Sequence, residues 1–156
     1  MSRIGAYFRD LREKMVNEPL SPNRVAAGWA LGMFAGCAIP FGFQLVISIP
    51  LSVMFRIGKV GATLGTLITN PVTIIFIYPA QTYVVSRLFF SGSLTYERLK
   101  TVEWTFDSAV QLGTEALLSF LIGGLLLALI MTPITFFAVR SLVKRTRARR
   151  RVADKS

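Results

Sequence analysis

The 156-residue sequence contains no histidine and only one cysteine, Cys37. Histidine is the side chain most often used as a general base and a metal ligand near neutral pH, so its absence removes the usual acid-base and metal chemistry. A single cysteine excludes an intramolecular disulfide and any metal site built from several cysteines. Acidic residues are scarce, with 8 against 18 basic ones, and there is no glycine-rich phosphate loop. We therefore expect neither an enzyme nor a bound cofactor.

Charged residues are missing from three long apolar segments of the chain. These segments are residues 25–55, 60–86 and 116–139. Each is longer than the roughly 20 apolar residues that a helix needs to cross the hydrocarbon core of a bilayer. The pattern predicts an all-α integral membrane protein.

Residues 1–20 carry charge, and their apolar side chains recur at the spacing of one helical face. This face consists of Ile4, Phe8, Leu11 and Met15. The pattern predicts an amphipathic helix that lies in the membrane interface. Pro19 should end this helix, and Ser21 followed by Pro22 is typical of the N-cap and first position of the next one.

Glycine recurs at four-residue spacing at the start of the first two apolar segments. The residues are Gly28, Gly32 and Gly36 in the first segment, and Gly61 and Gly65 in the second. Small residues at this spacing let two helix backbones approach closely in lipid, so we expect these faces to form helix contacts.

Both of these segments are also interrupted. Pro40 and Gly42 break the first, and Asn70 and Pro71 break the second. Asparagine is a good N-cap and proline is tolerated in the first turn, so Asn70 and Pro71 predict a half-helix that begins within the membrane. The free N–H groups of such a start favour an anion. The alternative is a kink whose backbone groups are satisfied by a neighbouring helix.

The candidate ligand site combines the two breaks with nearby cationic residues. Its members are Asn70, Pro71 and Thr73 at the second break, Gln44 at the first, and Arg24, Arg56 and Lys59 at the segment ends. The expected partners are membrane lipids with anionic headgroups. Ordinary anchoring at the membrane interface is the alternative role for the three cations.

Basic residues at both ends of the chain predict the topology. They place both termini in the cytoplasm, which requires an even number of crossings. Residues 25–55 then form a hairpin in preference to a single crossing, because the hairpin keeps Arg56 and Lys59 on the cytoplasmic side. The basic tail adjoins a span and lacks interleaved aromatic residues, so we expect it to bind lipid headgroups and not nucleic acid.

Five segments follow from these patterns. They are an interfacial amphipathic helix (1–20), a core with two broken membrane segments (21–90), an extracytoplasmic aromatic loop (91–109), a transmembrane helix (110–140) and a basic cytoplasmic tail (141–156).

The stretch from residue 20 to residue 79 resembles a bacterial family known as domain of unknown function 2062. The shared motifs are a Ser-Pro-x-Arg start (Ser21, Pro22, Arg24), a glycine-rich helix that ends in a Pro-to-Gln tip (Pro40, Gln44), and a Gly-Thr-x-x-x-Asn-Pro signature (Gly65, Thr66, Asn70, Pro71). The resemblance implies a protein of the bacterial inner membrane. Some relatives are joined to glycosyltransferase domains, which implies work on the cell envelope, but the family has no established activity.

Two functions fit the sequence. In the first, the protein binds or translocates an anionic lipid or lipid-linked phosphate at its broken half-helices, as a homo-oligomer because so few segments hardly enclose a pathway alone. In the second, it is a membrane scaffold for cell-envelope biogenesis, whose glycine faces mediate assembly and whose basic tail recruits partners.

Overall fold

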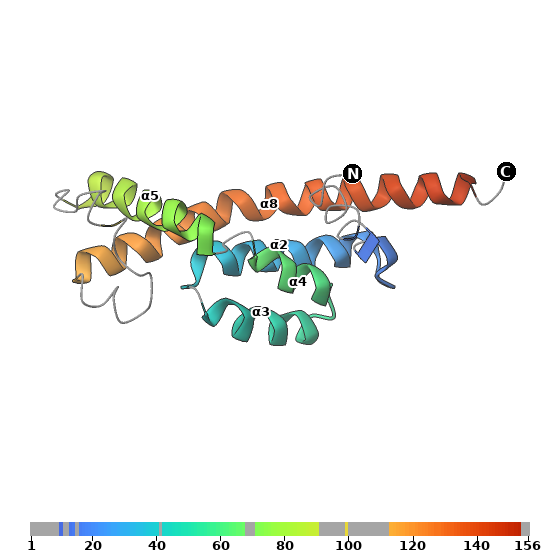
Figure 1. Ribbon diagram of the computed structural model, residues 1–156, viewed down its shortest axis with the longest axis horizontal. Coiled ribbons are helices and arrows are strands. Elements are labelled where there is room, and N and C mark those ends of the chain that lie inside the picture. Colours follow the sequence, from blue (N-terminus) through green and yellow to red (C-terminus); the bar gives the residue numbers. More distant parts are fainter. Residues whose placement is uncertain are drawn as a thin grey trace.

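The computed structural model describes residues 10, 13–14, 16–40, 42–67, 71–90, 99 and 113–153. Over these residues the protein is helical and contains no strand, which confirms the all-α part of the prediction. The principal helices are α2 (Pro22–Ala38), α3 (Phe43–Met54), α4 (Lys59–Thr66), α5 (Pro71–Phe89) and α8 (Thr114–Ala153), as Figure 1 shows. Asn70, most of segment 91–109 and the apolar face predicted for residues 1–20 lie outside the described residues.

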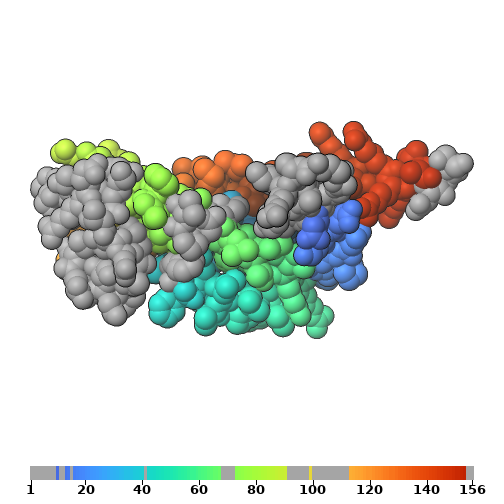
Figure 2. Space-filling view, in the orientation of Figure 1, coloured from blue at the N-terminus to red at the C-terminus, as the bar shows by residue number. Residues whose placement is uncertain are grey.

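The other helices pack along α8, which has 40 residues and is therefore about 60 Å long. In the described part of the chain it is the one helix long and apolar enough to cross a membrane, judged by length and composition. It contains the predicted span 116–139 and continues through the basic segment to Ala153, since arginine and lysine are good helix formers. Figure 2 shows this end of α8, in red, projecting beyond the neighbouring helices.

Three apolar clusters lie one after another along α8. Phe120 and Ala116 meet Ile74 and Tyr78 of α5, Ala128 meets Met33 and Cys37 of α2, and Val139 and Val143 meet Val25 and Trp29 of α2. Both α2 and α5 run antiparallel to α8; for α5 this follows because Ser86 bonds Glu115, whereas the earlier Gln81 lies beside Gly123. Helix α5 covers the first part of the apolar stretch of α8, and α2 covers the second part (Figure 1).

The start of α2 forms as its sequence predicts. Ser21 is the N-cap, with extended backbone, and its hydroxyl accepts a hydrogen bond from the Arg24 N–H at 3.4 Å. Pro22 occupies the first helical position, where the missing N–H costs no hydrogen bond. The preceding helical segment ends at Asn17, before Pro19, as predicted.

Helices α2 and α3 form a hairpin. Helix α2 ends at Ala38, and Gly42 adopts a φ of 98°, a conformation that glycine reaches without strain, so that α3 can turn back along α2. At the far end the Gly58 N–H donates to the Arg24 carbonyl at 2.9 Å, which fixes the return of the chain to the start of α2. The outer face of α3 is apolar and exposed, with Val46 69% and Met54 65% accessible.

Helices α2 and α4 pack closely through glycine. A Cβ atom added to Gly32 would lie 2.6 Å from the Ala62 carbonyl oxygen and 2.8 Å from the Gly65 Cα. A Cβ on Gly28 would collide with the Gly58 carbonyl, and one on Gly61 would collide with the Trp29 ring. The predicted glycine faces thus meet each other within one chain.

A second pair of glycines, which we did not single out in the sequence, lies on α8. A Cβ on Gly124 would lie 2.6 Å from the Cys37 carbonyl oxygen, and one on Gly123 would lie 2.8 Å from that of Gln81. Adjacent glycines therefore let α8 approach α2 with one face and α5 with the next.

Candidate functional site

The tip of the α2–α3 hairpin is held by two polar side chains. The Gln44 amide donates to the carbonyls of Gly36 at 3.2 Å and Ile39 at 3.1 Å, and to the Tyr78 hydroxyl at 2.9 Å. The Tyr78 hydroxyl in turn donates to the Ile39 carbonyl at 3.2 Å. The last carbonyls of a helix have no partner within it, so Gln44 and Tyr78 supply the donors that the end of α2 needs.

A row of buried polar side chains continues from this tip along the α5–α8 interface. The Ser86 hydroxyl donates to Glu115 Oε1 at 2.7 Å. The register set by this contact places Thr82 opposite Ser119, one helical turn closer to the hairpin tip. Both hydroxyls are fully buried and have no hydrogen-bond partner among the described residues. The interface thus combines a hydrogen-bonded pair, Ser86 and Glu115, with two hydroxyls, those of Thr82 and Ser119, that have no hydrogen-bond partner among the described residues.

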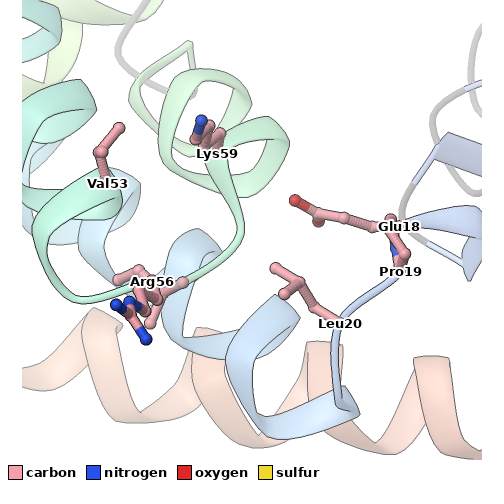
Figure 3. Close-up of a pocket in the computed structure, with 7 residues that line it drawn as sticks. Glu18, Pro19, Leu20, Val53, Arg56 and Lys59 are labelled. Carbon is pink, nitrogen blue, oxygen red and sulfur yellow. The ribbon is translucent and has the colours of Figure 1, made fainter.

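A cavity of about 420 Å³ opens at the other end of the hairpin. Its lining residues are Glu18, Pro19, Leu20, Val53, Arg56, Ile57 and Lys59, as Figure 3 shows. Two cations thus share the cavity with apolar side chains from α3 and from the turn before α2. Such a lining suits an amphiphile, because the cations can bind a charged head while the apolar residues contact a chain.

Glu18 is the one carboxylate among these lining residues. It accepts backbone hydrogen bonds from Lys59 and Val60 at the start of α4, whose N-cap, Gly58, offers no side-chain acceptor. Burial raises the pKa of Glu18, and the two backbone bonds and the charge of Arg147 partly offset this rise. Its Oε2 atom is buried and has no hydrogen-bond partner among the described residues. The carboxylate is therefore only partly satisfied.

Arg147 of α8 holds the turn that carries Glu18. Its guanidinium donates to the carbonyls of Val16 at 3.1 Å, Glu18 at 2.7 Å and Leu20 at 2.7 Å. Arg150 adds a bond of 2.7 Å to Asn17 Oδ1. The basic extension of α8 thus binds residues 16–20 through contacts that span about 130 positions of sequence.

A second cavity, of about 410 Å³, lies between the start of α2 and this extension. It is lined by Pro22, Lys144, Arg147, Ala148 and Arg151. Together with Arg56 and Lys59, these residues concentrate positive charge at one end of the molecule.

The structure divides the predicted ligand site into two places. Arg24, Arg56 and Lys59 lie at the basic end, whereas Gln44 lies at the hairpin tip, at the opposite end of α3, which has 12 residues and is about 18 Å long. Thr73 is half-buried on α5. Asn70 and the side chain of Pro71 lie outside the described residues.

Sequence reasoning missed three side chains that shape these places. Glu18, Tyr78 and Arg147 were not among the predicted site residues. A conspicuous signal existed for Glu18 alone, since it is an acidic residue close to Arg24 and to the N-terminus of α2. Among the described residues no three potential ligands cluster to hold a metal ion.

A model of the bacterial family DUF2062, described as an uncharacterised protein conserved in bacteria, matches residues 6–152. The chain belongs to this family. The match extends well beyond residues 20–79, on which the resemblance was first noted, and takes in the N-terminal segment and nearly all of α8. No curated protein and no solved structure matches the chain.

Proposed function

We propose that this DUF2062 protein is a bacterial inner-membrane protein that binds the phosphate-bearing head of an anionic lipid or lipid-linked phosphate at the cavity of Arg56 and Lys59. The observation that carries the proposal is this cavity, which joins two cations to an apolar lining at the basic end of the molecule. Ligand binding at the second break, around Asn70, Pro71 and Thr73, remains a prediction from the sequence.

The packing against α8 supports a membrane position. The apolar stretch of α8 has its middle near Ala128, and the end of α2 packs beside Gly124 and Ala128. The α2–α3 hairpin would therefore enter the bilayer from the basic end and turn near its middle. Backbone at that depth must be satisfied by protein, a role that Gln44 and Tyr78 fill for the carbonyls at the tip.

The basic end then faces the cytoplasm. Its cations are Arg24, Arg56 and Lys59 around the hairpin, and Lys144, Arg147 and Arg151 on α8. Basic residues next to membrane spans favour the cytoplasmic side, so both termini are assigned there. In this position the cavity would meet the headgroups of the inner leaflet, while the exposed apolar face of α3 would contact acyl chains.

Lipid titration tests the proposal. Protein purified in detergent is titrated with phosphatidylglycerol, and with phosphatidylcholine of the same acyl chains, and bound lipid is counted by native mass spectrometry. The variant Arg56→Gln/Lys59→Gln should lose most of the preference for phosphatidylglycerol. Arg145→Gln/Arg149→Gln removes the same charge from exposed positions of α8 outside the cavity and should retain it. Equal binding of the two lipids by the wild-type protein would exclude the proposal.

The scaffold function remains a second candidate because of the basic extension of α8. This extension is a continuous helix, and the cavity of Lys144, Arg147 and Arg151 offers it a shaped surface for an acidic partner. The glycine faces do not favour it, since Gly32 and Gly65 contact each other within the chain. Crosslinking in native membranes distinguishes the two, because a scaffold would yield a defined partner that Lys144→Gln/Arg151→Gln loses. The same experiment tests the predicted homo-oligomer.

A further inference from the structure

Glu18 occupies the place where the proposed ligand would bind. Its carboxylate accepts the N–H bonds of Lys59 and Val60 and points toward the start of α4, in the cavity that Arg56 and Lys59 also line, as Figure 3 shows. Among the described residues it forms no ion pair with either cation. Both cations therefore remain available to a second anion, while the backbone donors are already taken by the first.

We propose that Glu18 is a built-in competitor for the lipid phosphate, which displaces the carboxylate from the start of α4 when it binds. This inference rests on the proposed function and adds its regulation. Glu18 is a weak occupant, because one of its oxygens is buried without a partner. A phosphate carries more acceptor oxygens and can bind the backbone donors and a cation at the same time.

Displacement of the Glu18 carboxylate would involve the turn of residues 16–20, which Arg147 of α8 binds. Residues 16–20 precede the N-cap of α2, and the guanidinium of Arg147 donates to three of their backbone carbonyls. Arg147 thus acts as a latch that keeps the carboxylate in the cavity. Among the described residues the charge that acts on the Glu18 carboxylate is that of Arg147 of α8, while Lys59 of α4 and Arg56 of the preceding turn line the same cavity, and all three are cationic.

The central experiment compares Glu18→Gln with Glu13→Gln, which removes an equal charge from an exposed position. Phosphatidylglycerol is titrated into each protein in detergent, with phosphatidylcholine as the reference lipid. Removal of one like charge at close range should tighten phosphatidylglycerol binding by about fivefold in Glu18→Gln. Glu13→Gln should bind as the wild type does. A polyprenyl phosphate titrated in parallel identifies the source of the phosphate, and tightening for either lipid supports the inference.

Lowering the pH provides a second measurement on the unaltered protein. Burial raises the pKa of Glu18, so acidification neutralises this carboxylate earlier than an exposed one. Phosphatidylglycerol carries a phosphodiester and keeps its charge over this range, so the wild type should bind it more tightly at pH 5 than at pH 8. Glu18→Gln should show a smaller change.

A third measurement weakens the hold of Arg147 on the turn that carries Glu18. Arg147→Lys keeps the charge but loses the fork that binds three carbonyls, so it should also tighten binding, whereas Arg145→Lys on the same helix should not. If Glu18→Gln does not fold, the Arg147→Lys variant and the pH series still test whether Glu18 competes with the lipid phosphate. Wild-type binding that neither variant nor acid strengthens would overturn the inference and leave the proposed function intact. No preference for phosphatidylglycerol in any protein would instead overturn the proposed function.

Discussion

Gln44 and Tyr78 lie 34 positions apart in sequence, and the amide of the first donates to the hydroxyl of the second at 2.9 Å. Both side chains also bond the Ile39 carbonyl, at the point where α2 has ended and α3 has not begun. This relationship ties the hairpin tip to α5. Because both side chains bond one carbonyl, the coupling between them can be measured.

The first prediction concerns the Gln44 side chain. Gln44→Leu should lower the free energy of unfolding by about 1–3 kcal/mol, because buried carbonyls of α2 lose their donor. Urea unfolding in detergent measures this loss, with exposed Leu45→Ala as the control on the same turn. A variant as stable as the wild type would contradict the assigned role of Gln44.

The second prediction is that Gln44 and Tyr78 act together. Tyr78→Phe removes only the hydroxyl and should cost about 1 kcal/mol. Combined with Gln44→Leu it should cost less than the sum of the two single changes, since they share the Ile39 carbonyl. A double-mutant cycle measures the coupling, and strict additivity would show that the two side chains act independently.

The third prediction uses the glycine contact of α2 and α4. Gly32→Ala places a Cβ within 2.6 Å of the Ala62 carbonyl oxygen, so the helices must separate at a cost of about 1–3 kcal/mol. Thermal unfolding should show the loss. Leu31→Ala, at the neighbouring half-buried position, makes no such clash and serves as the reference, so equal stability of Gly32→Ala and wild type would argue against the close approach.

The fourth prediction distinguishes two kinds of buried hydroxyl between α5 and α8. Ser119→Ala removes a hydroxyl that has no partner among the described residues, so stability should stay equal or rise by up to about 1 kcal/mol. Ser86→Ala should lower it, because Glu115 loses a donor at 2.7 Å. Unfolding curves of both variants measure these changes in stability. A Ser119→Ala variant less stable than Ser86→Ala would contradict the assignment of partners to these hydroxyls.

The fifth prediction follows from the pKa of Glu18, which burial raises above its ordinary value of 4.5. A raised pKa means that the folded protein binds this proton more tightly than the unfolded chain does, so the carboxylate disfavours folding as the pH rises through these values. Glu18→Gln should therefore melt higher than wild type at pH 7. The difference should shrink below pH 4.5, and a constant difference over this range would contradict the shift.

Much of the fold follows from local chemistry that the sequence displays. Ser21 and Pro22 start α2 where predicted, because an N-cap bond and a missing N–H involve only neighbouring residues. The interruption at Pro40 and Gly42 is also local, since proline ends a helix and glycine tolerates a positive φ. Apolar length alone identified α8, although its basic end could not be recognised as part of the same helix.

The candidate functional sites depend on tertiary contacts that no local sequence pattern encodes. Periodicity identifies a glycine face but not its partner, and only the packing shows that Gly32 meets Gly65 of the same chain. Glu18 and Arg56 share a cavity because the α2–α3 hairpin returns the chain to its own start.

Local sequence patterns therefore suffice to predict the helical class, the breaks and the concentration of positive charge at the chain ends. The tertiary structure decided which carbonyls Gln44 and Tyr78 satisfy, which N–H groups Glu18 binds and which turn Arg147 holds. The reason is physical: a cap or a break depends on the adjacent residues, whereas a hydrogen bond between distant segments depends on how whole helices pack.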